Sequence, residues 1–463
     1  MTRARDLADS ADKDIAGTLT LDGLTVAGNV SVDSGTIKLD GNYPTGTQNV
    51  ALGDNAGASL TSGAHNTFLG GNAGNAQTSA SSNTIIGNYA GNALTTGSSN
   101  TTVGRDSLLS NTTGASNTVL GRDALRSNTT ASRNTAVGYQ SSYANTTGSA
   151  NASVGYQALY ANTTGAENTA LGDQSLYLNT TGAGVTGLGR FALYSNTTGN
   201  YNTAVGLQSL ASNTTADNST AVGYQAAYSN NSTNGQHAVL GSQALYSNTS
   251  GNQNTALGRQ AMYANTTGSN NVAVGFLSMY NNTTASDNIA FGVNALYTNT
   301  TGTANTALGR SALRYNTTAS NNTAVGYEAL LDNTTGASNQ AVGNYALWNN
   351  TTGNSNQAMG YAALETNTTG ANNVAIGSNA LLSNTTASDN TAVGYQALLD
   401  NVTGTSLVAV GYQALANNTA NSNTAVGLSA LFTNTTGSEN TGLGTGALYA
   451  NTTGASNSAV GYG

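Results

Sequence analysis

The residues that could carry acid, base or metal chemistry are few and scattered in this chain. The two histidines, His65 and His237, have no titratable partner at a recurring spacing, which predicts solvated loop residues. Asp217, Asp287 and Asp389 occupy similar turn positions in non-adjacent repeats. Catalysis needs groups that converge, and calcium-binding solenoids need clustered aspartates. The sequence therefore predicts no catalytic residues, no metal site and no cofactor, and we expect that the chain is not an enzyme.

Two further patterns could bind or carry sugars. Tyrosines recur at one position of a repeat, where their rings could form a platform for stacking glycans: Tyr143, Tyr160, Tyr177 and Tyr194. The interpretation that we favour is that these rings cover a groove between layers or chains, with their hydroxyls in water. The Asn-Thr-Thr triplets match N-glycosylation acceptors, but turn formation explains them without glycans. An ice-binding threonine surface is disfavoured because adjacent threonines point to opposite faces of a strand.

The composition excludes several classes of protein. Charged residues make up 7% of the 463 residues, against about 25% in a typical soluble protein. The formal net charge is −8, so we expect no nucleic-acid partner, which would need a basic surface. No apolar stretch approaches the roughly 20 residues that span a bilayer. The hydrophilic first residues, "MTRARDLADSADKDIAG", also give no support for classical secretion.

The chain divides into two regions by composition. Residues 1–40 hold 11 of the 32 charged residues, and a turn-rich stretch with the only proline, Pro44, follows them. Apolar residues alternate with period two in residues 18–39, which predicts short β-strands or hairpins. We therefore expect an N-terminal attachment segment with short β-strands in residues 1–48, and a repeat domain in residues 49–463.

A recurring glycine, which usually follows an aliphatic residue, marks the repeat. This landmark glycine occurs 25 times from Gly53 to Gly461, and 22 of the 24 intervals are 17 residues long. One interval, beginning at Gly223, is 18 residues, and another, beginning at Gly411, is 16. Such a regular period indicates that each repeat is one physical layer.

Each repeat predicts one layer of a β-solenoid. The Val or Leu before the landmark glycine and the Leu that follows five residues later are expected on different short strands, with small alanines between them. Asn-Thr-Thr-Gly supplies a turn. An Asn seven residues after the landmark glycine recurs in 21 layers and is expected to stack on its copies as a side-chain amide ladder. The expected members of this ladder and of a dry aliphatic row are Asn111, Asn128, Asn145, Asn162, Asn179, Asn196, Val137, Val154, Leu171, Val205 and Val222.

The predicted fold class is therefore all-β, a β-solenoid or parallel β-roll of about 24 coils with a 17-residue period. Helices are disfavoured because the turn clusters leave at most about seven helix-compatible residues per layer, fewer than the roughly 12 that a stable helix needs. Layers spaced by about 4.8 Å would form a rod roughly 115 Å long. So thin a rod buries few aliphatic side chains per layer, which favours an intertwined homotrimer.

The repeat, as in "NTAVG" (134–138) and "TAVGYQAL" (391–398), resembles the head repeats of trimeric autotransporter adhesins, although its period is longer. The resemblance covers about residues 49–463 and implies a trimeric, left-handed parallel β-roll. Residues 18–53 are similar to the N-terminal region of tail-fibre proteins of marine tailed phages. That similarity implies a fibre joined to the virion by its N-terminal segment.

Three functions follow as competing hypotheses. The first is a structural phage tail fibre that assembles with itself, attaches to the baseplate or tail through its N-terminus and reaches a host surface glycan or protein. The second is a bacterial cell-surface adhesin or extracellular filament. The third, an enzyme acting on surface glycans, is the weakest because no acidic pair recurs. We expect the protein in the virion, or otherwise outside the cell or on its surface.

Overall fold

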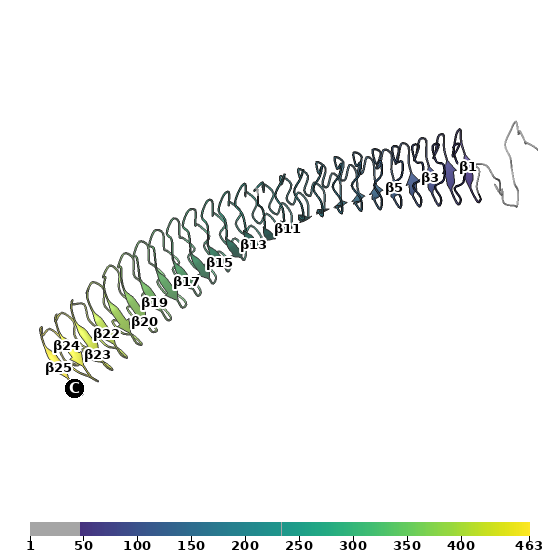
Figure 1. Ribbon diagram of the computed structural model, residues 1–463. Helices are drawn as coiled ribbons and strands as arrows, with labels where there is room; N and C mark the ends of the chain where they lie inside the picture. The colour runs from purple at the N-terminus through teal and green to yellow at the C-terminus, as the bar shows by residue number, and fades with distance from the viewer. Residues whose placement is uncertain (1–46, 233) are drawn as a thin grey trace, which may run out of the picture. The chain divides into compact units, whose positions relative to one another are not determined.

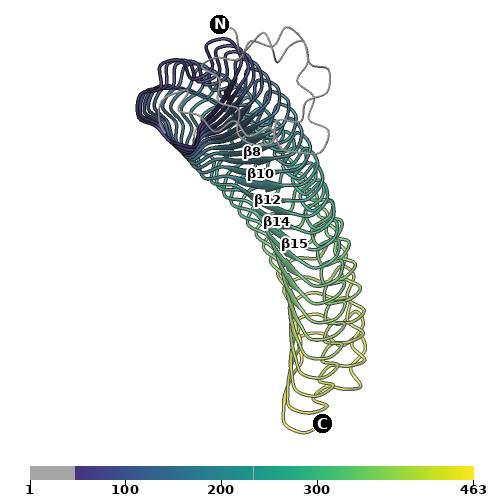
Figure 2. The same cartoon turned by 90° about the vertical axis from the view of Figure 1, so that its right-hand side faces the viewer.

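The computed structural model describes residues 47–463 except residue 233. In these residues each repeat contributes one short strand to a single parallel sheet. The N-terminal attachment segment expected in residues 1–48 lies almost entirely outside the described residues. In the described part, the coils follow one another in single file from β1 to β25 (Figure 1). The strands lie along one side of this stack (Figure 2).

All 25 described strands are three residues long. They are β1 (Val50–Leu52), β2 (Thr67–Leu69), β3 (Thr84–Ile86), β4 (Thr101–Val103), β5 (Thr118–Leu120), β6 (Thr135–Val137), β7 (Ala152–Val154), β8 (Thr169–Leu171), β9 (Thr186–Leu188), β10 (Thr203–Val205), β11 (Thr220–Val222), β12 (Ala238–Leu240), β13 (Thr255–Leu257), β14 (Val272–Val274), β15 (Ile289–Phe291), β16 (Thr306–Leu308), β17 (Thr323–Val325), β18 (Gln340–Val342), β19 (Gln357–Met359), β20 (Val374–Ile376), β21 (Thr391–Val393), β22 (Val408–Val410), β23 (Thr424–Val426), β24 (Thr441–Leu443) and β25 (Ser458–Val460).

Each strand pairs in parallel with the strand of the next repeat. Thr203 of β10 pairs with Thr220 of β11, one period later. The register survives the irregular repeats, because Thr220 pairs with Ala238 across the 18-residue interval and Val408 pairs with Thr424 across the 16-residue interval. The extra and missing residues therefore lie in turns. The prediction of an all-β parallel solenoid of about 24 turns with a 17-residue period is confirmed.

The core of each coil is a thin line of small and aliphatic side chains. In the coil that follows Gly155, Ala158, Leu159 and the middle strand residue Ala170 are all buried. The expected second strand around the leucine is wrong. Leu159 lies in a turn with a left-handed φ of 54°, and its backbone N–H donates to the carbonyl of Ser175 in the next coil.

A left-handed leucine recurs in most coils, although this conformation costs roughly 1–2 kcal/mol for a residue with a Cβ. Burial of a leucine side chain contributes about 1.5–3 kcal/mol, which offsets that cost. In the early coils the large and the small residue change places. There Gly74 and Gly91 take the left-handed position, while the inward strand residues are Phe68 and Ile85. A Cβ on Gly74 would lie 2.4 Å from the Phe68 ring, so no side chain fits at residue 74 while Phe68 holds the inward strand position.

This exchange predicts a compensating pair. Phe68→Ala should destabilise the first coils by about 3–5 kcal/mol, because it leaves a cavity beside Gly74. Gly74→Leu should also destabilise them through the clash with Phe68. The double variant should recover most of the stability, since it reproduces the Ala and Leu pair of later coils. Urea denaturation and hydrogen exchange of residues 66–91 would measure this, and purely additive losses would contradict it.

Candidate functional site

The predicted asparagines form a row of buried side-chain amides along the stack. Asn162 Nδ2 donates to Asn145 Oδ1 at 2.8 Å and to the carbonyl of Gly165 at 2.9 Å. The structure places the following predicted members in this first ladder: Asn111, Asn128, Asn145, Asn162, Asn179 and Asn196. Each amide therefore joins its own turn to the neighbouring coil.

A second asparagine ladder, which the sequence analysis missed, lies just before the strands. Asn151 Oδ1 accepts the backbone N–H of Asn168 at 2.9 Å, and Asn151 Nδ2 donates to the carbonyl of Gly165 at 2.9 Å. The signal is visible in the sequence, because an Asn stands four residues before the landmark glycine in 21 of the 25 repeats. The recurrent "NTA" opening of the strand thus has a structural role.

The two ladders meet at one carbonyl in most coils. The oxygen of Gly165 accepts both Asn151 Nδ2 and Asn162 Nδ2, each at 2.9 Å. A carbonyl oxygen has two lone pairs, so both are used. In most coils the buried amides are thereby satisfied within the chain, which lets a polar chain close a dry coil. Asn134 is an exception, because its buried Nδ2 has no hydrogen-bond partner among the described residues.

The predicted aliphatic row does not lie inside the coil. It occupies the last residue of each strand and faces outward, because the middle residue points to the core. Leu171 is 49% exposed and Val154 is 37% exposed, while Val137, Val205 and Val222 are half-buried. The structure describes a single chain, so burial of this row against the partner chains of a trimer stays a prediction. The outward position has a steric reason, since in most coils the buried leucine of the turn leaves room for alanine at the inward strand position and the larger side chain stays outside.

The two histidines differ in their surroundings. His65 is exposed, as expected, but the prediction of a solvated His237 is wrong, because this residue is only 3% exposed. His237 takes the place of an asparagine in the second ladder of the 18-residue repeat. Its Nδ1 accepts the backbone N–H of Asn254 at 3.2 Å. Burial lowers the pKa of His237 to about 4.

The tyrosines predicted as a platform stack on each other. Tyr143, Tyr160, Tyr177 and Tyr194 have ring centroids 5.1–5.2 Å apart and nearly parallel planes. Burial raises the pKa of Tyr160, and the neighbouring Tyr177 and Tyr143 raise it further. Because each ring covers a face of the next, the interior of this run offers no open ring face to a sugar, and only the outer faces of Tyr143 and Tyr194 remain.

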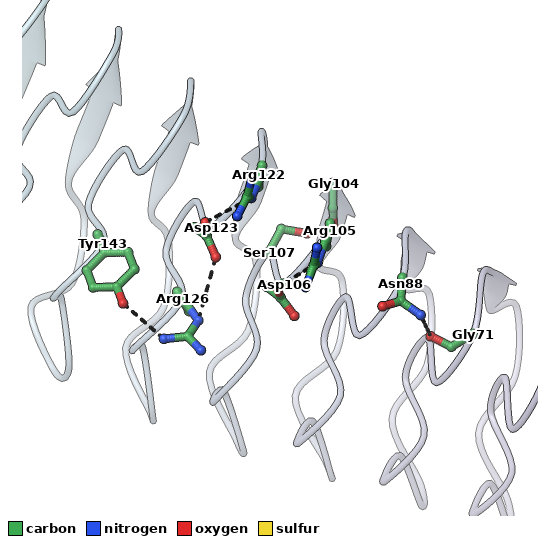
Figure 3. A network of polar contacts seen from close by, with 10 residues as sticks. All are labelled: Gly71, Asn88, Gly104, Arg105, Asp106, Ser107, Arg122, Asp123, Arg126 and Tyr143. Carbon is green, nitrogen blue, oxygen red and sulfur yellow. Dashed lines mark hydrogen bonds and ion pairs between the residues drawn. The ribbon is translucent and has the colours of Figure 1, made fainter.

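An arginine closes the first end of this tyrosine run. Arg126 Nη1 donates to the Tyr143 hydroxyl at 2.9 Å, and its guanidinium carbon lies 5.7 Å from the ring centroid (Figure 3). Asp123 holds the same guanidinium at 3.6 Å and also binds Arg122 (Figure 3). The cation therefore covers the last free face at that end.

Carboxylates with altered acidity are spread over separate coils. Burial raises the pKa of Asp332, with Glu328 adding to the effect, and burial alone raises the pKa of Glu365. Asp332 and Glu365 stand in coils that are separated by the coil of Trp348. Within residues 47–463 no group of three His, Asp or Glu side chains could hold a metal ion. That part of the chain also contains no helix able to cross a membrane.

No protein-family model matches the chain, and no curated protein sequence matches it.

The buried histidine predicts a pH-dependent stability. Between about pH 6.5 and pH 4 the unfolded chain binds a proton that folded His237 does not, so the free energy of unfolding should fall as pH falls. At about 1.36 kcal/mol per pH unit, the loss approaches about 3 kcal/mol. His237→Asn should restore the ladder and remove this part of the loss. Urea midpoints at pH 7 and pH 4.5 would measure it.

The matched control is His65→Asn, which removes the exposed histidine and should leave the pH dependence of the wild type. A wild-type loss that persists in His237→Asn, or that disappears in His65→Asn, would contradict the assignment.

Proposed function

We propose that this chain is a structural fibre protein, a phage tail fibre whose coil stack builds a rod-like shaft for attachment to a host surface. The observation that carries the proposal is the unbroken parallel register from β1 to β25. At each step, backbone hydrogen bonds and in most coils both amide ladders run along the stack, as at Asn151 and Asn162. A pull along the stack loads all bonds of one step together, which suits a shaft.

In this proposal the two regions of the chain have different roles. Residues 1–48 bind the baseplate or tail of the virion, and the repeat domain carries the contact with a glycan or protein of the host surface. The similarity of residues 18–53 to phage tail-fibre proteins supports this arrangement. The adhesin-like repeat supports the alternative, a bacterial cell-surface adhesin or extracellular filament.

Immunogold electron microscopy separates these two functions. Antibodies against residues 49–463 should label fibres on tailed particles produced by the source culture. Label along the cell envelope, with none on particles, would overturn the tail-fibre proposal and favour the adhesin.

Self-association follows from an apolar stripe on the outer face of the strands. The last strand residue is exposed in many coils, including Leu171 in β8, Leu240 in β12 and Phe291 in β15. Burial of exposed apolar area is favourable at about 25 cal/mol per Å². A partner that covers the stripe at every coil must share the same period, and a second copy of this chain does so. We propose a homotrimer, as the resemblance to the adhesin heads implies.

A charge on this stripe should prevent assembly. Light scattering of the whole chain should give about 139 kDa for three chains of 46.2 kDa. Leu240→Asp places a carboxylate on a residue that is 53% exposed in the single chain, so it should keep the fold and shift the mass toward one chain. The control Thr267→Asp adds the same charge on an exposed turn and should remain trimeric. A folded wild-type chain of single-chain mass would overturn the proposal.

A further inference from the structure

The row of stacked tyrosines has one internal gap. Its first run ends at Tyr194, and its second run starts at Tyr228 and continues with centroids 5.1–5.4 Å apart. In the single coil between the two runs, Ala211 occupies the tyrosine position. The coil itself is regular there, since Ser195 N donates to the carbonyl of Ala211 and Ser212 N donates to that of Tyr228, both at 3.0 Å.

The missing ring leaves a hollow. It has a volume of about 300 Å³ and is lined by Tyr194, Tyr228 and Ala211 together with Phe191. Ala211 is only 8% exposed and forms the floor. Phe191 meets Tyr194 edge-to-face, with centroids 5.6 Å apart. One face of Tyr194 and one face of Tyr228 are therefore turned toward an open space, unlike the ring faces inside the two runs.

Phe191 also interrupts a row of glutamine side chains and leaves two polar atoms at the hollow. Gln174 Nε2 donates to Gln157 at 2.9 Å, and Gln208 Oε1 accepts from Gln225 at 2.9 Å. The other ends, Gln174 Oε1 and Gln208 Nε2, have no hydrogen-bond partner among the described residues. Both glutamines line the hollow, which thus has an acceptor and a donor next to its aromatic walls.

The width of the gap and its two amide atoms together select the guest. Two coil steps place the planes of Tyr194 and Tyr228 about 9.6 Å apart. Contacts of about 3.8 Å on each side leave about 2 Å for the thickness of the guest itself. A planar aromatic ring would meet both walls at the spacing of the stacked tyrosines, so the width alone also admits such a ring. A puckered pyranose ring with C–H groups on both faces fills the space, and its hydroxyls suit one amide acceptor and one amide donor.

We propose that the hollow at Ala211 is a binding site for a single pyranose residue, held between Tyr194 and Tyr228 and oriented by Gln174 and Gln208. The site deepens the proposed function, on which it rests, because it names a sugar unit of the host surface as the ligand of the shaft. It differs from a continuous tyrosine platform, since only the break in the stack exposes ring faces.

Saturation-transfer NMR on the whole chain tests the site. The probes are methyl α-glucopyranoside, methyl β-galactopyranoside and methyl N-acetyl-β-glucosaminide, with p-cresol as the planar guest. The wild type should transfer saturation to at least one pyranoside. Ala211→Tyr should complete the stack and reduce that transfer at least tenfold. Ala416→Tyr is the matched control, because Ala416 holds the same repeat position in a distant coil, and it should bind like the wild type.

Tyr228→Ala provides a second variant that removes one wall without filling the hollow, and it should also lose the pyranoside signal. Circular dichroism should report unchanged folding for each variant. Binding by Ala211→Tyr or Tyr228→Ala equal to that of the wild type, transfer to p-cresol alone, or no transfer to any pyranoside would overturn the site. These outcomes leave the tail-fibre proposal standing if the immunogold label lies on virions, so the two failures are distinguishable.

Discussion

The whole structure depends on the close approach of each landmark glycine to the next coil. At 24 of the 25 positions, a Cβ on this glycine would lie 2.2–2.8 Å from the carbonyl group of the following landmark glycine. The glycine φ of about 127–144° is also one that side chains rarely allow. Only glycine permits the chain to turn off the strand at this spacing. The 17-residue period follows, because each coil must bring the next glycine back to the same place.

The close stacking also explains the unusual composition. Any side chain that recurs at one position meets its own copy in the next coil, so a recurring charge would repel itself along the stack. Asparagine avoids this, because its amide carries both a donor and an acceptor. The two amide ladders therefore fill the polar part of the coil, and most charged residues, such as Glu167, are not repeated in the next coil. Arg105 and Arg122 do recur in successive coils, but each forms an ion pair with the aspartate that follows it.

Much of the fold could be predicted from the sequence, because the period, the turns and the parallel stack all follow from repetition. The facing of single residues could not. In the strand Thr203–Val205, hydrophobicity alone would place the valine inside, whereas the alanine faces the core beside the buried leucine of the turn. The expected strand at Leu159 failed for a related reason, since burial of the leucine compensates for a left-handed turn that propensity alone disfavours. The trimer and the fibre role remain proposals.

The candidate sites were harder to predict, because they depend on departures from the repeat. The burial of His237 could be predicted only once the second ladder was known, because this histidine occupies a position that holds asparagine in most coils. Ala211 does not indicate a site by its residue type, since alanine is common in the chain. It marks a hollow only because tyrosines occupy the same position in the coils on both sides.

A column of identical coils presents the same surface at every step, so a ligand bound at one coil would find equivalent sites at its neighbours. Distinct recognition at one place requires a coil that differs from those next to it. The changes at Phe191 and Ala211 fall in two successive coils and act on two neighbouring rows, one of glutamines and one of tyrosines. A single random loss would disturb one row. Their coincidence exposes ring faces and amide atoms together, which is the combination that recognition of a sugar requires.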